Sequence, residues 1–190
     1  MDADFSIELG HEDPVLDVPW TDPAERLAYF DLKRQPELIA KIEEATKFAE
    51  LAEFLRAVNS ARSMVESAKC DVWATAELSA EEEIFNASHK LASYVDLVFS
   101  DIGQRRSFPF HESFARRLTE LLRRAPEIGA AVEVCVRRCF FSGAEHIREG
   151  FYFTVYVNGY GDDESAARKN WAIATKLVGN AIVQLSAKRE

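Results

Sequence analysis

Two neighbouring segments of the chain, residues 130–141 and 150–158, alternate apolar with other side chains. This alternation predicts two β-strands, because successive side chains of a strand point to opposite faces of a sheet. The eight residues that link them, SGAEHIRE, suit a hairpin loop. The core of the fold is therefore expected to be a largely antiparallel sheet.

The same alternation sorts the side chains of these strands into two faces. The face expected to point inward carries Val132, Val134, Val136, Phe140, Phe151, Phe153, Val155 and Val157. The other face combines aromatic, charged and polar side chains, to which a third strand would add Trp73: the set is Glu133, Arg137, Tyr152, Thr154, Tyr156 and Trp73. Aromatic residues and Arg are enriched in interface cores, so this set predicts a homodimer or partner surface, or the floor of a ligand pocket. The alternative is that the helical part of residues 36–58 or the N-terminal segment covers it.

Residues 79–101 have the spacing of one long amphipathic helix. Ser79 and Glu82 match the S-x-x-E capping box that starts a helix. The polar face of this helix would hold a narrow stripe in steps of three and four, formed by Glu82, Asn86, His89, Ser93 and Asp96.

The stripe suggests a catalytic hypothesis. His89 would act as a base or metal ligand and Asp96 as its partner, with Asn86 and Ser93 as orienting groups. On a helix His89 and Asp96 would lie about 10.5 Å apart along the axis, so any joint action would need a bridging ligand. The alternative is a solvent face, or a face covered by the N-terminal segment.

The remaining pattern completes a β-α-α-β-β-α order over the last two-thirds of the chain. A strand is expected over residues 70–78, a loop over 103–110, and helices over 112–124 and 162–187. Before them, residues 36–58 predict one helix, or two separated near Thr46. The expected class is α+β, with a three-stranded, mainly antiparallel sheet and helices packed on it.

The N-terminal residues have a different composition. Residues 1–35 are rich in acids and proline and predict an extended arm that lies on the body of the protein. Residues 1–60 are thus expected to be an acidic arm and a helical segment packed on the main body. Residues 61–190 are expected to be the α+β domain, and the two parts to form one structural unit.

Charge and cysteine content restrict the class of partner and the setting. The net charge is −9; the first hundred residues hold 9 basic and 21 acidic side chains, and the other ninety hold 14 and 11. This acidity argues against a nucleic-acid partner, because phosphate contacts need clustered Lys and Arg. No apolar run has the length of a membrane span and no secretory signal is recognisable at the start, so no membrane partner is expected. Three cysteines with no disulfide pattern suggest a reduced, cytoplasmic setting.

The sequence contains no motif of known catalytic mechanism. The pairs His11–Glu12 and His111–Glu112 lack the spacing of a metal site, so neither a metal nor a cofactor is expected. The expected function is binding or self-association, as a homo-oligomer and most simply a dimer, rather than an activity that rests on a recognisable catalytic motif. One alternative is an enzyme whose pocket for a small polar substrate uses His89 and Asp96. Another is a regulatory protein that binds a basic partner through residues 1–35.

Overall fold

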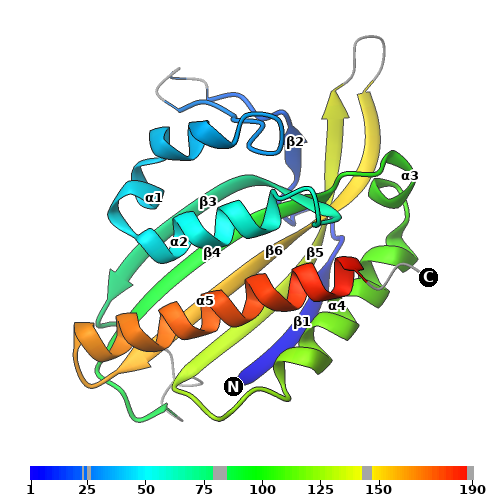
Figure 1. Ribbon diagram of the computed structural model, residues 1–190. Coiled ribbons are helices and arrows are strands. Elements are labelled where there is room, and N and C mark those ends of the chain that lie inside the picture. The colour runs from blue at the N-terminus through cyan, green and yellow to red at the C-terminus, as the bar shows by residue number, and fades with distance from the viewer. Residues whose placement is uncertain (23, 25–26, 79–84, 143–146, 188–190) are drawn as a thin grey trace.

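The computed structural model covers the chain of 190 residues, and the structure describes residues 1–22, 24, 27–78, 85–142 and 147–187. Within these ranges six strands form one sheet, and the longer helices lie on one of its faces (Figure 1). The strands are β1 (Asp2–Glu8), β2 (Leu16–Val18), β3 (Val65–Thr75), β4 (His89–Phe99), β5 (Ala130–Ser142) and β6 (Ile147–Gly161). The helical segments are the 3₁₀ helix η1 (Pro36–Lys41) and the helices α1 (Glu43–Lys47), α2 (Ala49–Val58), α3 (Ile102–Arg105), α4 (Phe108–Leu122) and α5 (Glu164–Ala187).

The sheet is mixed, with the strand order β1-β5-β6-β4-β3. At its centre β5 and β6 form the predicted antiparallel pair, with Val134 opposite Val155. β6 pairs with β4 and β4 with β3, both antiparallel. On the other side of β5, β1 and β2 pair with successive stretches of that strand and run parallel to it.

The α+β class is confirmed, but the three-stranded, mainly antiparallel sheet is wrong. Two of the additional strands, β1 and β2, come from the residues that were expected to form an extended arm. Their backbone groups bond to β5, so that Asp2 lies opposite Ala131. No local pattern encodes a pairing between opposite ends of a chain, whereas a hairpin is visible in its own sequence.

The predicted helix over residues 79–101 is also wrong, because its second half is the strand β4. β4 is an inner strand with apolar residues on both faces: Leu91, Val95 and Leu97 lie toward the helices, and Ala92 and Val98 toward the other face. A strand buried on both faces loses its period-two signal and imitates the broad apolar stripe of a helix. The capping-box residues Ser79 and Glu82 fall outside the described residues.

Smaller differences occur at the ends of elements. The expected loop over residues 103–110 contains α3 and the start of α4, where the Ser107 side chain accepts a hydrogen bond from the backbone N–H of Phe110. The segment over residues 36–58 is broken twice, at Ile42 and Phe48, where the backbone is extended. The final helix begins as expected, with Asp163 accepting from the backbone N–H of Ala166 at 2.8 Å. Phe140, expected in the core, is 37% exposed near the end of β5.

α5 crosses the sheet diagonally and packs closely on its central strands (Figure 1). Trp171 is fully buried, and its indole N–H donates to the Ser93 hydroxyl of β4 at 2.8 Å. Beneath it, a Cβ placed on Gly159 of β6 would lie 2.2 Å from the backbone nitrogen of Trp171. The absence of a side chain at this position therefore lets the helix reach the sheet.

This contact predicts that Gly159→Ala lowers the free energy of unfolding by about 2 kcal/mol or more, because the helix backbone must shift. Gly179→Ala in α5 is the matched control, since its new Cβ would come no closer than 3.2 Å, to a side-chain carbon of Phe54. Alanine there also gains up to about 1 kcal/mol of helix propensity. Urea unfolding followed by circular dichroism measures both variants. Equal midpoints for Gly159→Ala and the parent would contradict the close approach.

Candidate functional site

The face of the sheet opposite α2, α4 and α5, here called the open face, holds the side chains that were predicted to form a binding surface. In β5 and β6 every second side chain, such as Val134 and Val155, belongs to the main core beneath the helices. The side chains between them therefore point to the open face. The register places Glu133 beside Tyr156, and Arg137 beside Tyr152. Trp73 joins them from β3, because its cross-strand partner Ala92 lies on the same face. The structure thus brings the six residues of this set onto one face.

A hydrogen-bonded network crosses four strands of the open face. The Arg137 guanidinium of β5 donates from Nε to Glu8 of β1 at 2.7 Å. It also donates from Nη1 to the hydroxyls of Thr154 at 2.9 Å and Tyr156 at 3.1 Å, both on β6. Thr154 in turn donates to Asp96 of β4 at 2.6 Å. Arg137 and Asp96 are only 8% and 6% exposed, so the network satisfies charges that would be costly if left unpaired.

The pKa values of the two carboxyl groups at the ends of this network are shifted in opposite directions. The hydrogen bond from Arg137 lowers the pKa of Glu8, so this carboxylate stays ionised. Burial raises the pKa of Asp96 to about 6, against the hydrogen bond from Thr154 and the attraction of Arg137. The Glu8 end therefore carries a fixed ion pair, while the Asp96 end changes its charge in mildly acidic solution.

Three aromatic rings form a row beside this network, hereafter the aromatic row. The centroids of Trp73 and Tyr94 are 6.3 Å apart, and those of Tyr94 and Tyr156 are 6.2 Å apart. The Arg137 guanidinium lies 5.6 Å from the ring centroid of Tyr156, within cation–π range. Trp73 is 40% exposed at the end of the row. The row thus presents accessible aromatic surface across β3, β4 and β6.

The N-terminal segment covers the other part of the open face. A second apolar cluster lies there and consists of Leu16, Val18, Ala68, Val98, Cys139 and Tyr152, with Trp20, Tyr29 and Phe141 packed against it. The segment leaves β2 beside β5 and reaches β3, where the Trp20 indole N–H donates to the carbonyl of Ala68 at 2.7 Å. Tyr152 is only 3% exposed in this cluster, so it belongs to the packing and not to an accessible surface.

The predicted polar stripe is divided between the two faces of the sheet. Side chains alternate between the two faces along β4, so His89 and Ser93 share the helix side, where the Ser93 hydroxyl accepts from the Trp171 indole N–H. Asp96 lies on the open face. Asn86 is exposed just before β4, with a positive φ of 46°. A sheet therefore separates His89 from Asp96, and the structure does not bring them together.

His89 lines a cavity of about 390 Å³ at the end of the β3–β4 pair, together with Phe48, Leu91, Ala167 and Arg168. Among the described residues, none accepts from or donates to its Nδ1 atom. The Arg168 guanidinium forms an ion pair with the Glu50 carboxylate at 3.1 Å. The same cavity is also lined by Lys90 and Glu164, so His89 is not its only titratable side chain.

Sequence reasoning missed Glu8 and Tyr94 as members of the open face. Nothing local to Glu8 signals its place, because it reaches Arg137 through the parallel pairing of β1 with β5. For Tyr94 a signal was present: Tyr94 and Asp96 are two residues apart, as side chains on one face of a strand are. The assignment of this segment to a helix concealed that spacing.

Two buried groups, Asp96 and His111, are expected to make the stability of the protein depend on pH in opposite ways. Burial lowers the pKa of His111 to about 4; its ring packs 4.6 Å from Phe99, and its Nδ1 lies 2.9 Å from the Ser107 carbonyl oxygen. Folded Asp96, with its raised pKa, holds a proton more tightly than the unfolded chain, so its contribution declines as the pH rises from about 4 to about 6. Unfolded His111 holds the proton more tightly, so stability is lost as the pH falls from about 6.5 to about 4.

Asp96→Asn is therefore expected to gain stability relative to the parent between about pH 4 and pH 7, by up to about 3 kcal/mol. His111→Phe should change in the opposite direction, gaining relative to the parent as the pH falls through the same window. Urea unfolding of each variant and of the parent at several pH values measures how the difference in the free energy of unfolding changes with pH. A difference that is constant with pH for Asp96→Asn would show that its carboxyl titrates normally in the folded protein.

The other features of the described chain do not add a recognisable site. The structure describes no helix that is both long enough and apolar enough to cross a membrane. Its described residues also contain no group of three or more His, Cys, Asp or Glu side chains arranged to hold a metal ion. The chain matches no protein-family model, no curated protein and no solved structure.

Proposed function

We propose that the protein works by binding, and that it self-associates through the aromatic row of Trp73, Tyr94 and Tyr156. The observation that supports this best is the position of the row. It lies on the face that α2, α4 and α5 do not cover, and beyond the cluster that the N-terminal segment packs against. Its outermost member, Trp73, exposes 40% of its surface.

The chemistry of the row suits a contact between two identical surfaces. Trp, Tyr and Arg contribute large contact areas and are enriched in the residues that dominate binding energy. In a two-fold symmetric dimer the same patch occurs on both sides, so it must carry both partners of each contact. The row is bordered by acids and bases on the same face, namely Asp71, Glu133, Lys69 and Lys90. A patch with both signs of charge can therefore face its own copy without net repulsion.

The edge of the sheet next to the row supports the same proposal. β3 is the last strand in the sheet order, and side chains of the N-terminal segment protect its first half. Lys33 donates to the carbonyls of Ser63 and Val65, at 2.7 and 2.9 Å, and Trp20 donates to that of Ala68. Among the described residues, no comparable side-chain bond covers the outer carbonyls from Asp71 to Thr75. An uncovered strand edge is a favourable place for another chain to pair.

The two alternative functions have less support. An enzyme that uses His89 and Asp96 together would need both on one side of the sheet, and they lie on opposite sides. A regulatory role for residues 1–35 would rest on their acidic groups, and two of these are engaged within the chain. Asp4 and Glu8 of that segment already form ion pairs with Arg123 and Arg137 of the same chain, at 3.0 and 2.7 Å. Neither alternative is therefore proposed.

Multi-angle light scattering of the purified protein tests the proposal. The parent should have twice the chain mass of 21.5 kDa, and Trp73→Glu should shift it to the monomer by weakening dimerisation about 100-fold or more. Trp73 is the better position for a charge than Tyr152, which is buried in the second cluster. Ile102→Glu is the control, because Ile102 is 60% exposed on α3, outside the row. A monomeric parent at high concentration, or an unaffected Trp73→Glu dimer, would refute the proposal.

A further inference from the structure

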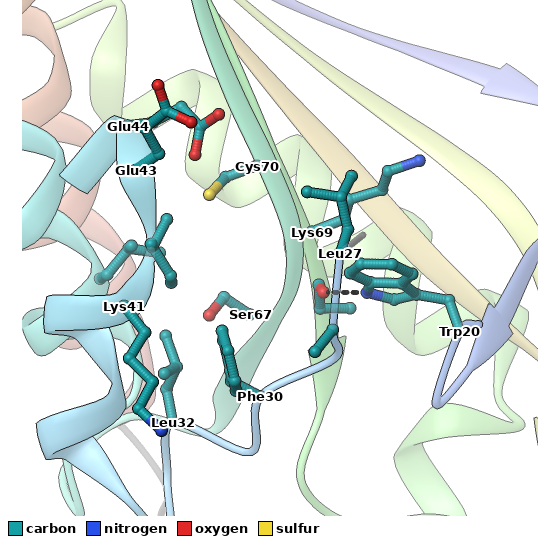
Figure 2. Close-up of a pocket in the computed structure, with 14 residues that line it drawn as sticks. Trp20, Leu27, Phe30, Leu32, Lys41, Glu43, Glu44, Ser67, Lys69 and Cys70 are labelled. Atoms are coloured by element: carbon teal, nitrogen blue, oxygen red, sulfur yellow. Dashed lines mark hydrogen bonds between the residues drawn. The ribbon is translucent and has the colours of Figure 1, made fainter. Parts of the chain in front are cut away.

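A second cavity lies apart from the aromatic row, between the first half of β3 and the segment that contains η1 and α1. Its volume is about 320 Å³ (Figure 2). The floor comes from β3 through Ser67 and Cys70, whose cross-strand partners Leu97 and Val95 are on the helix side of the sheet. The N-terminal segment closes the cavity with Trp20, Phe30 and Leu32. A cavity of this size is at the lower end of small-molecule sites, which span roughly 300–1,000 Å³.

The wall of the cavity is mostly apolar, with two small polar groups on one side. Figure 2 shows the Ser67 hydroxyl and the Cys70 thiol pointing into the space between β3 and the helical segment. Asn59 donates to the Ser67 oxygen at 2.8 Å, which fixes the hydroxyl and leaves its hydrogen free to donate. Burial, with a smaller effect of the Glu44 charge, raises the pKa of Cys70 to about 12. The thiol therefore stays neutral and lines the site as a weakly polar group, without the reactivity of a thiolate.

Acidic and basic side chains occupy different parts of the cavity lining. In Figure 2 the carboxylates of Glu43 and Glu44 are together at one end, while the ammonium groups of Lys41 and Lys69 point away from the centre. The Lys69 ammonium lies 5.8 Å from the ring centroid of Trp20. Glu43 is bound to Lys47 at 2.5 Å, whereas half-buried Glu44 has no ion pair within the described chain. Lys47 interacts with the charges of both Glu43 and Glu44 and offsets only part of them, so this end of the cavity carries a net negative charge.

We infer that this cavity binds a small apolar amine, with its hydrophobic body among Trp20, Phe30 and Leu55 and its ammonium group toward Glu44. The apolar wall supplies the hydrophobic contribution, and the cationic head can gain both the charge of Glu44 and the faces of aromatic rings. An acid of the same shape would place its carboxylate beside Glu44 and be repelled. The floor residues Ser67 and Cys70 lie on the face of β3 opposite the aromatic row, while Lys69 is at the border of both sites. The two proposals rest on different residues and are tested separately.

Isothermal titration calorimetry of the full-length protein with three probes of one shape tests the inference. The probes are 2-phenylethylamine, 2-phenylethanol and phenylacetate. The amine is expected to bind at least 10-fold more tightly than the alcohol, and phenylacetate more weakly than either. Trp73→Glu should bind the amine as the parent does, so that failure of one proposal is distinguished from failure of the other. Equal affinities for the three probes, a preference for phenylacetate, or no amine binding at millimolar concentration would overturn the inference.

Two variants locate the site. Glu44→Gln should reduce the preference for the amine over the alcohol to less than about 3-fold, while Glu53→Gln, an exposed acid of α2 outside the cavity, should keep it. Cys70→Phe should abolish binding of the amine and the alcohol by filling the space. Backbone amide shifts of the parent on adding the amine should centre on Ser67 and Cys70, which tests the location even if the filled variant does not fold. An unchanged preference in Glu44→Gln, or shifts elsewhere, would contradict the assignment.

Discussion

Trp171 ties the helical layer to the middle of the sheet, and the arrangement of the other elements depends on this contact. Its indole ring is fully buried, its N–H donates to Ser93 of β4, and its backbone lies directly above Gly159 of β6. A helix this close to the strands needs a glycine beneath it, which fixes the place where α5 can cross. α2 and α4 pack against α5 in the same layer. The opposite face is therefore left to the N-terminal segment and to the aromatic row.

The N-terminal segment is held on that face by the second apolar cluster and by polar contacts. Glu8 lies directly opposite Arg137 in the β1–β5 register, and the two form an ion pair of low exposure on the arginine side. A buried charge without a partner is much more costly than a paired one, so this pair disfavours other registers of β1. Arg137 also bonds to Thr154 and Tyr156, so the N-terminal strand and the open face share one network. The position of β1 thus helps to orient Tyr156 in the aromatic row.

Local patterns predicted the elements that carry their signal within themselves. The β5–β6 pair and α5 follow from short-range periodicity and were predicted correctly. The assignment of Val134 and Arg137 to opposite faces of the sheet follows from the same periodicity and was also correct. β4 was missed because a strand buried on both faces no longer alternates, and β1 because its partner is at the far end of the chain. The set around Arg137 and Tyr156 was therefore found from sequence, while Glu8 and Tyr94 were not. Asp96 was selected for the wrong reason, as a helical neighbour of His89.

β3 is where the two proposed sites meet, and its two faces explain why they differ. One alternation contains Trp73 of the aromatic row with Lys69 and Asp71 at its border, and the other places Cys70 in the cavity. The register shift between Ser67 and Lys69 inserts Ala68, which turns toward the second apolar cluster and offers its carbonyl to Trp20. Trp20 thus has two roles: it lines the cavity, and it packs against the second apolar cluster where the N-terminal segment stops covering the open face. A bulge bends a strand and re-aims its side chains. This single irregularity therefore lets one edge strand line a partly open, mostly apolar cavity with its first half and form part of an accessible surface with its second.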